Sequence, residues 1–178
     1  CVQHNAVALA DEVYERLVFE PSAPHVPMAS LPGMAERTVT LSSLGKTFSF
    51  TGWKIGWAVA PPPLSAAVRA AHQFLTFAVN TPMQHAAAAA LEREGEAVEE
   101  LMAVLSLNRR RLVDALAELG FVVHEPAGTY FVCADHSAVS TAMGCSDDRS
   151  FVLELIKRCG VAAIPPSVFY ERPELGKS

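Results

Sequence analysis

The sequence has little charge of either sign and no long apolar run. Charged residues make up 19% of the 178 residues, the formal net charge is -5, and the only dense cationic run, residues 109–111, lies inside a helical pattern. A nucleic-acid partner is therefore not expected, because such proteins present basic surfaces to the phosphate backbone. Hydrophobic residues reach 51%, yet no apolar run approaches the roughly 20 residues that a membrane helix needs. These absences predict a soluble globular protein without a membrane partner.

Cysteine and histidine are also sparse and scattered. Cys1, Cys133, Cys145 and Cys159 lack the spacing of a metal site, and the six histidines form no metal-like pair at helical spacing. No signal peptide is visible that would direct the chain to an oxidising compartment. We therefore expect reduced thiols, a cytoplasmic location and no bound metal.

The two ends of the sequence predict a piece of a longer protein. The chain opens on Cys1 rather than on Met, runs almost directly into a strand-like segment, and stops after Lys177 and Ser178 without a closing element. No internal repeat and no low-complexity segment is apparent.

The first half of the chain has the pattern of an α/β fold. Residues 6–10 form a short continuous apolar run, which is typical of a strand buried on both faces of a parallel sheet. Residues 20–36 contain four prolines and are expected to form a loop. Further strands are predicted at residues 38–41 and 55–60, and helices at residues 64–75 and 83–91.

The second half predicts one long helix followed by a small α+β unit. Apolar residues recur at helical spacing over residues 97–119, and Gly120 is placed as a helix terminator. Beyond it we expect a helix at about 149–159, capped by Asp147 or Asp148, and strands at residues 121–124, 129–134 and 161–164. The plausible domain boundary is the long helix, which gives domains at residues 1–95 and 96–178.

Polar side chains follow two of the predicted strands. Asp11 and Tyr14 come after the first strand, and Ser43 and Lys46 after the second. Ligands of open α/β sheets bind beyond the carboxyl ends of the strands, so these two groups could face one ligand. Each residue also has an ordinary structural explanation, since an Asp after a strand often caps a helix and a lone Lys is usually a solvated charge.

The longer strings around these residues closely resemble the class I/II aminotransferases, in the branch of the kynurenine and methionine aminotransferases. The resemblance covers nearly the whole chain and is carried by Asp11-Glu12-Val13-Tyr14, Ser42-Ser43-Leu44-Gly45-Lys46-Thr47-Phe48-Ser49-Phe50-Thr51-Gly52-Trp53-Lys54-Ile55-Gly56-Trp57, residues 82–84, Gly128-Thr129-Tyr130-Phe131 and Val161-Ala162-Ala163-Ile164-Pro165. It implies part of the large α/β/α domain that binds pyridoxal 5'-phosphate (PLP), in residues 1–95, followed by a small, incomplete α+β carboxyl-terminal domain, in residues 96–178.

The resemblance also implies roles for single residues. Lys46 is expected to hold PLP as a Schiff base and, once substrate has displaced it, to act as the base that moves the substrate proton. Asp11 is expected to pair with the protonated pyridine nitrogen, and Tyr14 to donate to the phenolate oxygen of the ring. Ser43 and Lys54 are expected to bind the phosphate by hydroxyl and by charge.

Three other positions are informative. Many members of the family have Arg where this chain has Lys54, but Lys is familiar in the branch named above, so the difference narrows the branch. Tyr130 and Phe131 are assigned no catalytic role, because aromatic residues in strands are common in cores. Phe77 matches an aromatic that reaches the partner subunit's substrate pocket in the kynurenine branch, although a core Phe is an equal alternative.

The implied function is transamination between an amino acid and a 2-oxo acid by a PLP-dependent homodimer. Two alternatives stay open: β-elimination from cysteine conjugates, and a ligand-sensing domain of a transcription regulator. The resemblance places the substrate-binding Arg beyond residue 178, and the ring-stacking residue before Cys1. We therefore expect the 178-residue chain by itself to be inactive.

Overall fold

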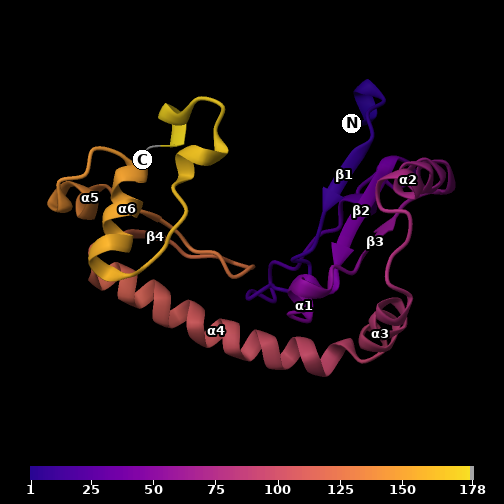
Figure 1. The fold of residues 1–178 in the computed structure, drawn as a ribbon, viewed down its shortest axis with the longest axis horizontal. Helices are drawn as coiled ribbons and strands as arrows, with labels where there is room; N and C mark the ends of the chain where they lie inside the picture. Colours follow the sequence, from indigo (N-terminus) through magenta and orange to yellow (C-terminus); the bar gives the residue numbers. More distant parts are fainter. Residues whose placement is uncertain (177–178) are drawn as a thin grey trace. The chain divides into compact units, whose positions relative to one another are not determined.

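The computed structural model describes residues 1–176, which form two compact units. Unit 1 comprises Cys1–Ser106 together with Ala127–Tyr130, and unit 2 comprises Leu107–Pro126 together with the described residues from 131 to 176. The boundary falls within the long helix α4, Glu94–Glu118 (Figure 1). The assignment of residues 1–95 to a cofactor-binding domain and of 96–178 to a small domain stays a prediction.

Unit 1 is built on a three-stranded mixed sheet with the order β1-β2-β3. β1, Ala8–Asp11, runs parallel to β2, Thr38–Ser43, and β3, Gly56–Val59, runs antiparallel to β2 (Figure 1). The alternating Thr and Val at the start of β2 suit a strand, because β-branched side chains pack well on a pleated surface. The strands predicted at residues 6–10, 38–41 and 55–60 are therefore confirmed, with shifted ends.

One expectation about the first strand is wrong. The apolar run predicts burial on both faces, but β1 alternates between half-buried and exposed residues, and Leu9 is 72% exposed. β1 is an edge strand in the sheet order, and nothing among residues 1–176 covers the face on which Leu9 lies. An apolar sequence shows that a strand is suited to burial on both faces. Whether both faces are in fact buried depends on which other segments pack against them.

Two helices of unit 1 begin at a capping side chain, and a third begins at proline. α1, Leu44–Thr47, is capped by the Ser43 side chain, and α3, Thr81–Glu92, by the Asn80 side chain. α2, Pro62–Leu75, opens on proline, whose missing N–H and fixed φ suit the first turn. The helices predicted at residues 64–75 and 83–91 are confirmed, while α1, which carries Lys46, is an addition.

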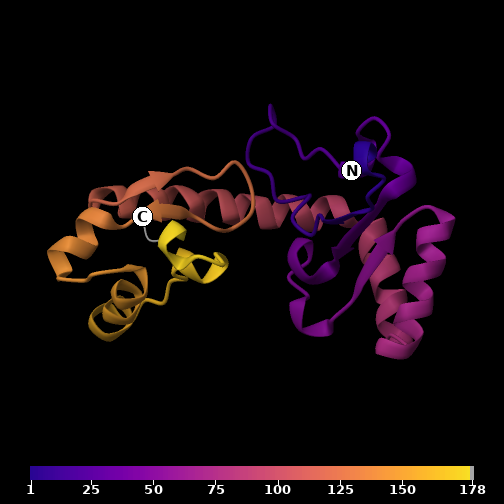
Figure 2. The ribbon, with the colours of Figure 1, turned by 90° about the horizontal axis from the view of Figure 1, so that it is seen from above.

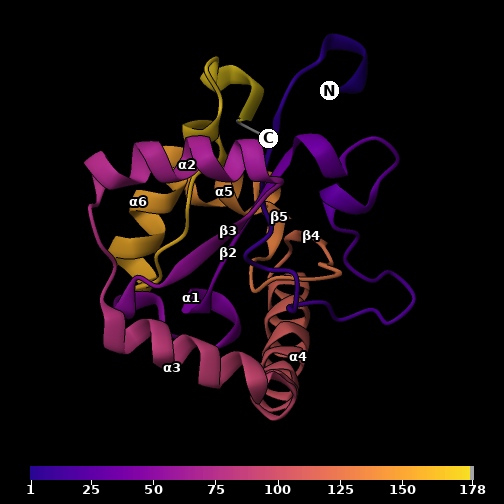
Figure 3. The same cartoon turned by 90° about the vertical axis from the view of Figure 1, so that its right-hand side faces the viewer.

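A small apolar core joins α1 to the sheet and to α3. Leu44, Ile55 and Ala87 are at most 8% exposed, and around them pack the partly buried side chains of Phe48, Trp57, Val79, Met83 and Ala90. Figure 3 shows α3 beside α1, in agreement with this contact. Apolar packing against the sheet and α3 thus fixes α1, the helix that carries Lys46.

Unit 2 contains the end of α4, a two-stranded antiparallel sheet and two helices. β4, Val122–His124, pairs with β5, Cys133–Asp135, and the orange strands lie beside the end of α4 (Figure 2). α5, Ser137–Met143, and α6, Asp148–Cys159, follow. Short 3-10 helices complete the described elements: η1 Val2–His4, η2 Met28–Ser30, η3 Ala35–Arg37, η4 Thr51–Trp53, η5 Pro166–Phe169 and η6 Pro173–Gly176.

The helices predicted at residues 97–119 and 149–159 and the strand predicted at residues 121–124 are confirmed, the strand at residues 129–134 is confirmed only at its end, and the strand at residues 161–164 is wrong. Of the strand expected at residues 129–134 only its end is extended, because Thr129 takes a φ of 65° and breaks the run. No strand forms at residues 161–164, where Val161 and Ile164 are 52% and 61% exposed. A β-strand needs a pairing partner, and the described part of the chain offers none there.

Asp148 fastens α6 to η5 from a buried position. Its side chain is 1% exposed, its Oδ2 accepts from the Ser167 N–H at 2.7 Å, and its Oδ1 accepts from the Arg149 N–H at 2.9 Å. Burial by itself raises the pKa of the Asp148 carboxyl, but the hydrogen bonds from Ser167 and Arg149 outweigh burial and leave the pKa below its ordinary value. The ionised form therefore stabilises the folded state.

We expect Asp148→Asn to loosen α6 and η5. The asparagine amide turns one acceptor into a donor that faces a backbone N–H, which lowers local stability by about 1–3 kcal/mol. Hydrogen–deuterium exchange of peptides from α6 and η5 should become faster. Because the folded-state pKa is depressed, the stabilisation is present above the ordinary carboxyl pKa and is lost as pH falls through the lowered value.

The matched control is Asp114→Asn, at an exposed position on α4. It should leave the exchange of these peptides unchanged. Equal exchange in wild type and Asp148→Asn near neutral pH would contradict the assigned role of the carboxylate.

Candidate active site

The carboxyl end of β1 places Asp11 and Tyr14 at the edge of the sheet where β2 also ends. Asp11 is level with Leu41 in the parallel register, and the Glu12 N–H continues the ladder to the Leu41 carbonyl at 2.8 Å. The Asp11 carboxylate is exposed, and its Oδ1 accepts from the Val13 N–H at 3.3 Å. This bond fixes the carboxylate at the start of the turn that leads to Tyr14.

Three of the predicted residues line one cavity of about 290 Å³. Ser43 comes from the end of β2, Lys46 from α1, and Lys54 from the turn between η4 and β3. The other lining residues are Gly45, Phe50, Thr51, Ile55 and Gly56. The cavity therefore combines a hydroxyl and two ammonium groups, which are suitable donors for a phosphate.

Backbone geometry holds this cavity open and in place. Lys54 has a φ of 56°, in the left-handed region that residues other than glycine seldom adopt. The Thr51 hydroxyl donates to the Gly45 carbonyl at 2.7 Å, and the Leu44 N–H donates to the Ile55 carbonyl at 3.1 Å. These bonds tie α1 to the segment that carries Lys54.

Lys46 and Tyr14 meet through a third residue, Tyr130. The Lys46 ammonium donates to the Tyr130 hydroxyl oxygen at 2.8 Å, and the Tyr14 hydroxyl donates to the same oxygen at 3.3 Å. The two rings pack edge to face with centroids 5.4 Å apart, and Lys46 Nζ lies 5.4 Å from the centroid of each ring. The amine is thus held by one strong hydrogen bond and by the faces of two aromatic rings.

Hydrogen bonds and burial shift the pKa values of the Lys46 ammonium and of the Tyr14 and Tyr130 hydroxyls. The hydrogen bond to Tyr130 raises the pKa of the Lys46 ammonium, and the same bond lowers the pKa of the Tyr130 hydroxyl. Burial raises the pKa of the Tyr14 hydroxyl, and its bond to Tyr130 adds to this rise. The arrangement therefore keeps the free Lys46 side chain protonated.

Sequence reasoning missed Tyr130. The residue lies 84 positions after Lys46, and a pattern of local spacing carries no sign that the two touch. The available signal is the string Gly128-Thr129-Tyr130, which the resemblance already included, and in which Thr129 takes a positive φ. A non-glycine residue in that conformation often marks a functional segment.

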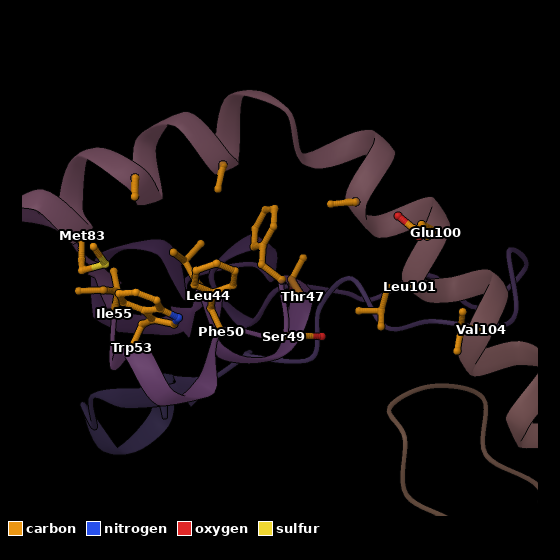
Figure 4. Close-up of a pocket in the computed structure, with 14 residues that line it drawn as sticks. Leu44, Thr47, Ser49, Phe50, Trp53, Ile55, Met83, Glu100, Leu101 and Val104 are labelled. Atoms are coloured by element: carbon orange, nitrogen blue, oxygen red, sulfur yellow. The ribbon is translucent and has the colours of Figure 1, made fainter.

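A larger cavity lies next to the site but contains none of the predicted site residues. It has a volume of about 480 Å³ and is lined mainly by apolar side chains from α1, η4, α3 and α4. Figure 4 shows Leu44, Ile55 and Met83 on one side of it, and Leu101 and Val104 on the other. Its polar lining residues are Thr47, Ser49 and Glu100, and none of its lining residues is cationic, so the chemistry is assigned to the smaller cavity around Lys46.

Comparison with known proteins identifies the family of this chain. The family model of aminotransferase class I and II matches residues 1–177. The chain belongs to this family, which confirms the resemblance, and family members use PLP. Among the described residues, no group of His, Cys, Asp and Glu could hold a metal ion, and no helix is long and apolar enough to cross a membrane.

Three relatives define the neighbourhood within the family. The probable N-succinyldiaminopimelate aminotransferase DapC of Mycobacterium tuberculosis is 47% identical over 99% of this chain and 43% of the relative. The crystal structure of YbdL from Escherichia coli, described as a methionine aminotransferase, is 43% identical with a TM-score of 0.89 over 99% of this chain and 45% of that one. Kynurenine–oxoglutarate transaminase 1 of Mus musculus is 38% identical over 97% of this chain and 44% of the relative.

These likenesses confirm the predicted fold class and the predicted branch. They also show that the chain spans about 43% of the length of the first relatives it matches.

We expect Gly56→Ala to disturb the sheet beside the cavity. A Cβ at residue 56 would lie 2.7 Å from the Ser42 carbonyl oxygen and 3.1 Å from Ser43 Cβ. Because both obstacles are part of β2 rather than the ends of flexible side chains, β3 must move away. The free energy of unfolding should fall by roughly 1–3 kcal/mol, measured by urea denaturation followed through the fluorescence of Trp53 and Trp57.

Gly52→Ala is the matched control, since a Cβ at residue 52 meets nothing within 4 Å. It should leave the urea midpoint almost unchanged. Equal midpoints for the two variants would show that the close approach of β3 to Ser42 is not a constraint.

Proposed function

We propose that this chain carries the cofactor lysine and the phosphate cup of a PLP-dependent aminotransferase, with Lys46 as that lysine. The observation that carries the proposal is the single cavity lined by Ser43, Lys46 and Lys54, next to the hydroxyl groups of Tyr14 and Tyr130. Membership of the aminotransferase class I and II family supports it.

The donor set fits the phosphate end of PLP. Ser43 Oγ accepts from the Gly45 N–H at 3.1 Å, which leaves the hydroxyl proton for an anion. A Cβ at Gly45 would lie 3.1 Å from Ser43 Oγ, so glycine keeps this side of the cavity clear. Lys54 adds a point charge, which neutralises phosphate without the bidentate geometry that an arginine would impose.

Lys46 is the group that joins the cofactor and moves the proton. When bound, PLP supplies an electron sink for the electrons released at the substrate Cα. With PLP in the site, the neutral Lys46 amine would hold the cofactor aldehyde carbon covalently, with water as the leaving group, and once substrate had taken its place the same amine would be the base that accepts the Cα proton. Tyr14, three residues after Asp11, would donate to the phenolate oxygen of the ring and so help to orient it.

Asp11 is proposed to hold the proton on the pyridine nitrogen. Its position at the end of β1, level with Leu41, puts a carboxylate on the sheet edge at which β2 leads into Ser43. An anion at that point keeps the ring cationic, and a cationic ring is the stronger electron sink. A neutral side chain would leave the nitrogen free to lose its proton.

The substrates are proposed to be an amino acid and a 2-oxo acid. The names of the relatives, which include N-succinyldiaminopimelate, methionine and kynurenine aminotransferases, support amino transfer over β-elimination or ligand sensing. Pyruvate release from a cysteine thioether would indicate elimination instead.

A homodimer and a cytoplasmic location complete the proposal. Phe74, Leu75 and Phe77 are 85%, 85% and 82% exposed, an arrangement that suits an apolar subunit contact. The cysteines at positions 1, 133, 145 and 159 are unpaired, as expected of reduced thiols.

Lys46→Ala should abolish covalent attachment of PLP in the full-length protein. Borohydride treatment followed by peptide mass spectrometry should find the cofactor on the peptide that contains Lys46 in wild type, and on none in the variant. Turnover should fall by about 10³-fold or more, because the base that moves the proton is also lost. Lys157→Ala, on α6, is the control and should keep both properties; attachment at another lysine in Lys46→Ala would remove Lys46 from the mechanism.

Asp11→Asn should retain the cofactor and lose most of the turnover. The asparagine cannot hold the pyridine nitrogen protonated, so kcat should fall on the order of a hundredfold while the cofactor content, measured by absorbance after release in alkali, stays near that of wild type. Asp114→Asn should behave as wild type. A near-normal kcat in Asp11→Asn would exclude the proposed pairing.

A further inference from the structure

Tyr130 belongs to unit 1, although in the sequence the segments before and after residues 127–130 belong to unit 2. The Phe19 N–H donates to the Ala127 carbonyl at 2.7 Å, and the Thr129 N–H donates to the Leu17 carbonyl at 2.7 Å. Leu17 is 1% exposed, so the loop of residues 127–130 is fastened to a buried point. These bonds fix the backbone from which the Tyr130 side chain reaches Lys46.

The close approach of the loop to Leu17 requires glycine at residue 128. A Cβ on Gly128 would lie 2.7 Å from the Leu17 carbonyl oxygen, so the two backbones meet at a distance that only glycine permits. Thr129 then takes a φ of 65°, which is strained for a β-branched residue and costs about 1–3 kcal/mol. Backbone strain next to a reactive amine points to function rather than to simple packing.

The Tyr130 oxygen accepts hydrogen bonds from both Lys46 and Tyr14. A tyrosine hydroxyl has two acceptor positions, and here one receives Lys46 Nζ at 2.8 Å and the other the Tyr14 hydroxyl at 3.3 Å. The Tyr130 side chain is 44% exposed, so burial of the ring does not explain its place. The oxygen therefore determines where the free Lys46 amine lies relative to Tyr14.

We propose that Tyr130 is a positioning residue for Lys46, which holds the free amine against Tyr14 whenever the lysine is not attached to the cofactor. The inference rests on the proposed function, because it assigns the role within the same site. The bond favours the ammonium form, in agreement with the raised pKa of Lys46. An ammonium has no lone pair, so Lys46 must give up a proton and leave Tyr130 before it can attack a carbonyl carbon.

The test compares the reactivity of Lys46 in the cofactor-free protein. Tyr130→Phe keeps the ring and removes only the acceptor oxygen. Trinitrobenzenesulfonate is the amine probe, and labelling of the peptides that contain Lys46 and Lys54 is followed by mass spectrometry as a function of pH. Loss of the oxygen should raise the labelling of Lys46 relative to Lys54 about threefold at a fixed pH, because an amine without this acceptor gives up its proton more readily.

Two further variants sharpen the result. Tyr170→Phe is the matched control, since Tyr170 is exposed to a similar degree, 47%, and belongs to unit 2; it should not change the labelling ratio. Gly128→Ala displaces the loop but keeps the hydroxyl, and it should raise the labelling of Lys46 in the same direction. An unchanged ratio in both Tyr130→Phe and Gly128→Ala would overturn the positioning role.

A kinetic measurement separates positioning from substrate binding. In the full-length holoenzyme, Tyr130→Phe should lower kcat by about tenfold or more, because the amine is no longer directed, and should leave KM nearly unchanged. A raised KM with an unchanged kcat would instead show that Tyr130 contacts substrate, and would refute this inference. The labelling arm uses no cofactor, so it can fail while Lys46 remains the attachment residue, and the proposed function can fail while the labelling shift is seen.

Discussion

The parallel pairing of β1 with β2 is the constraint on which the candidate site depends. Its register sets Asp11 level with Leu41, and β2 then continues for two residues to Ser43. The Asp11 carboxylate and the Ser43 hydroxyl thus reach one edge of the sheet from segments that lie far apart in sequence. A shift of one residue would turn every side chain of β1 to the opposite face, and Asp11 would lose its present place at that edge. The backbone hydrogen bonds between β1 and β2, continued by the Glu12 N–H to the Leu41 carbonyl, hold this register.

The phosphate end of the site depends on a tight return of the chain. After β2, the backbone forms α1, passes through η4 and comes back as β3, antiparallel to β2. The return brings Gly56 against the Ser42 carbonyl and requires a positive φ at Lys54. The positive φ at Lys54 is a strained conformation, and the close approach at Gly56 leaves no room for a side chain. Lys54 and Gly56 both line the cavity. The apolar packing of Leu44, Ile55 and Ala87 beneath α1 supplies the stability that sustains them.

Electrostatics around Lys46 are arranged for control of one proton. The Tyr130 oxygen stabilises the ammonium, and the faces of Tyr14 and Tyr130 add attraction for the same charge. The positive charge is then available near the place proposed for a phosphate and a ring phenolate. Formation of a bond to carbon requires that this charge be lost, so the groups that hold the free lysine also regulate when it reacts. Such control needs a rigid acceptor. Two backbone hydrogen bonds hold the loop of residues 127–130 in place: the Thr129 N–H donates to the Leu17 carbonyl, and the Phe19 N–H donates to the Ala127 carbonyl.

The sequence by itself determined the α/β class, most helices and strands, and the five residues assigned to the site. Periodicity and caps are local properties, and the motif around Lys46 is a continuous string, so both can be read without a structure. The tertiary structure alone decided that Ser43, Lys46 and Lys54 line one cavity, that Leu9 is exposed, that residues 161–164 have no strand partner, and that Tyr130 reaches Lys46. Each of these depends on which distant segment lies alongside. The contact across 84 residues follows from backbone hydrogen bonds and a positive φ that no local pattern of residue types specifies.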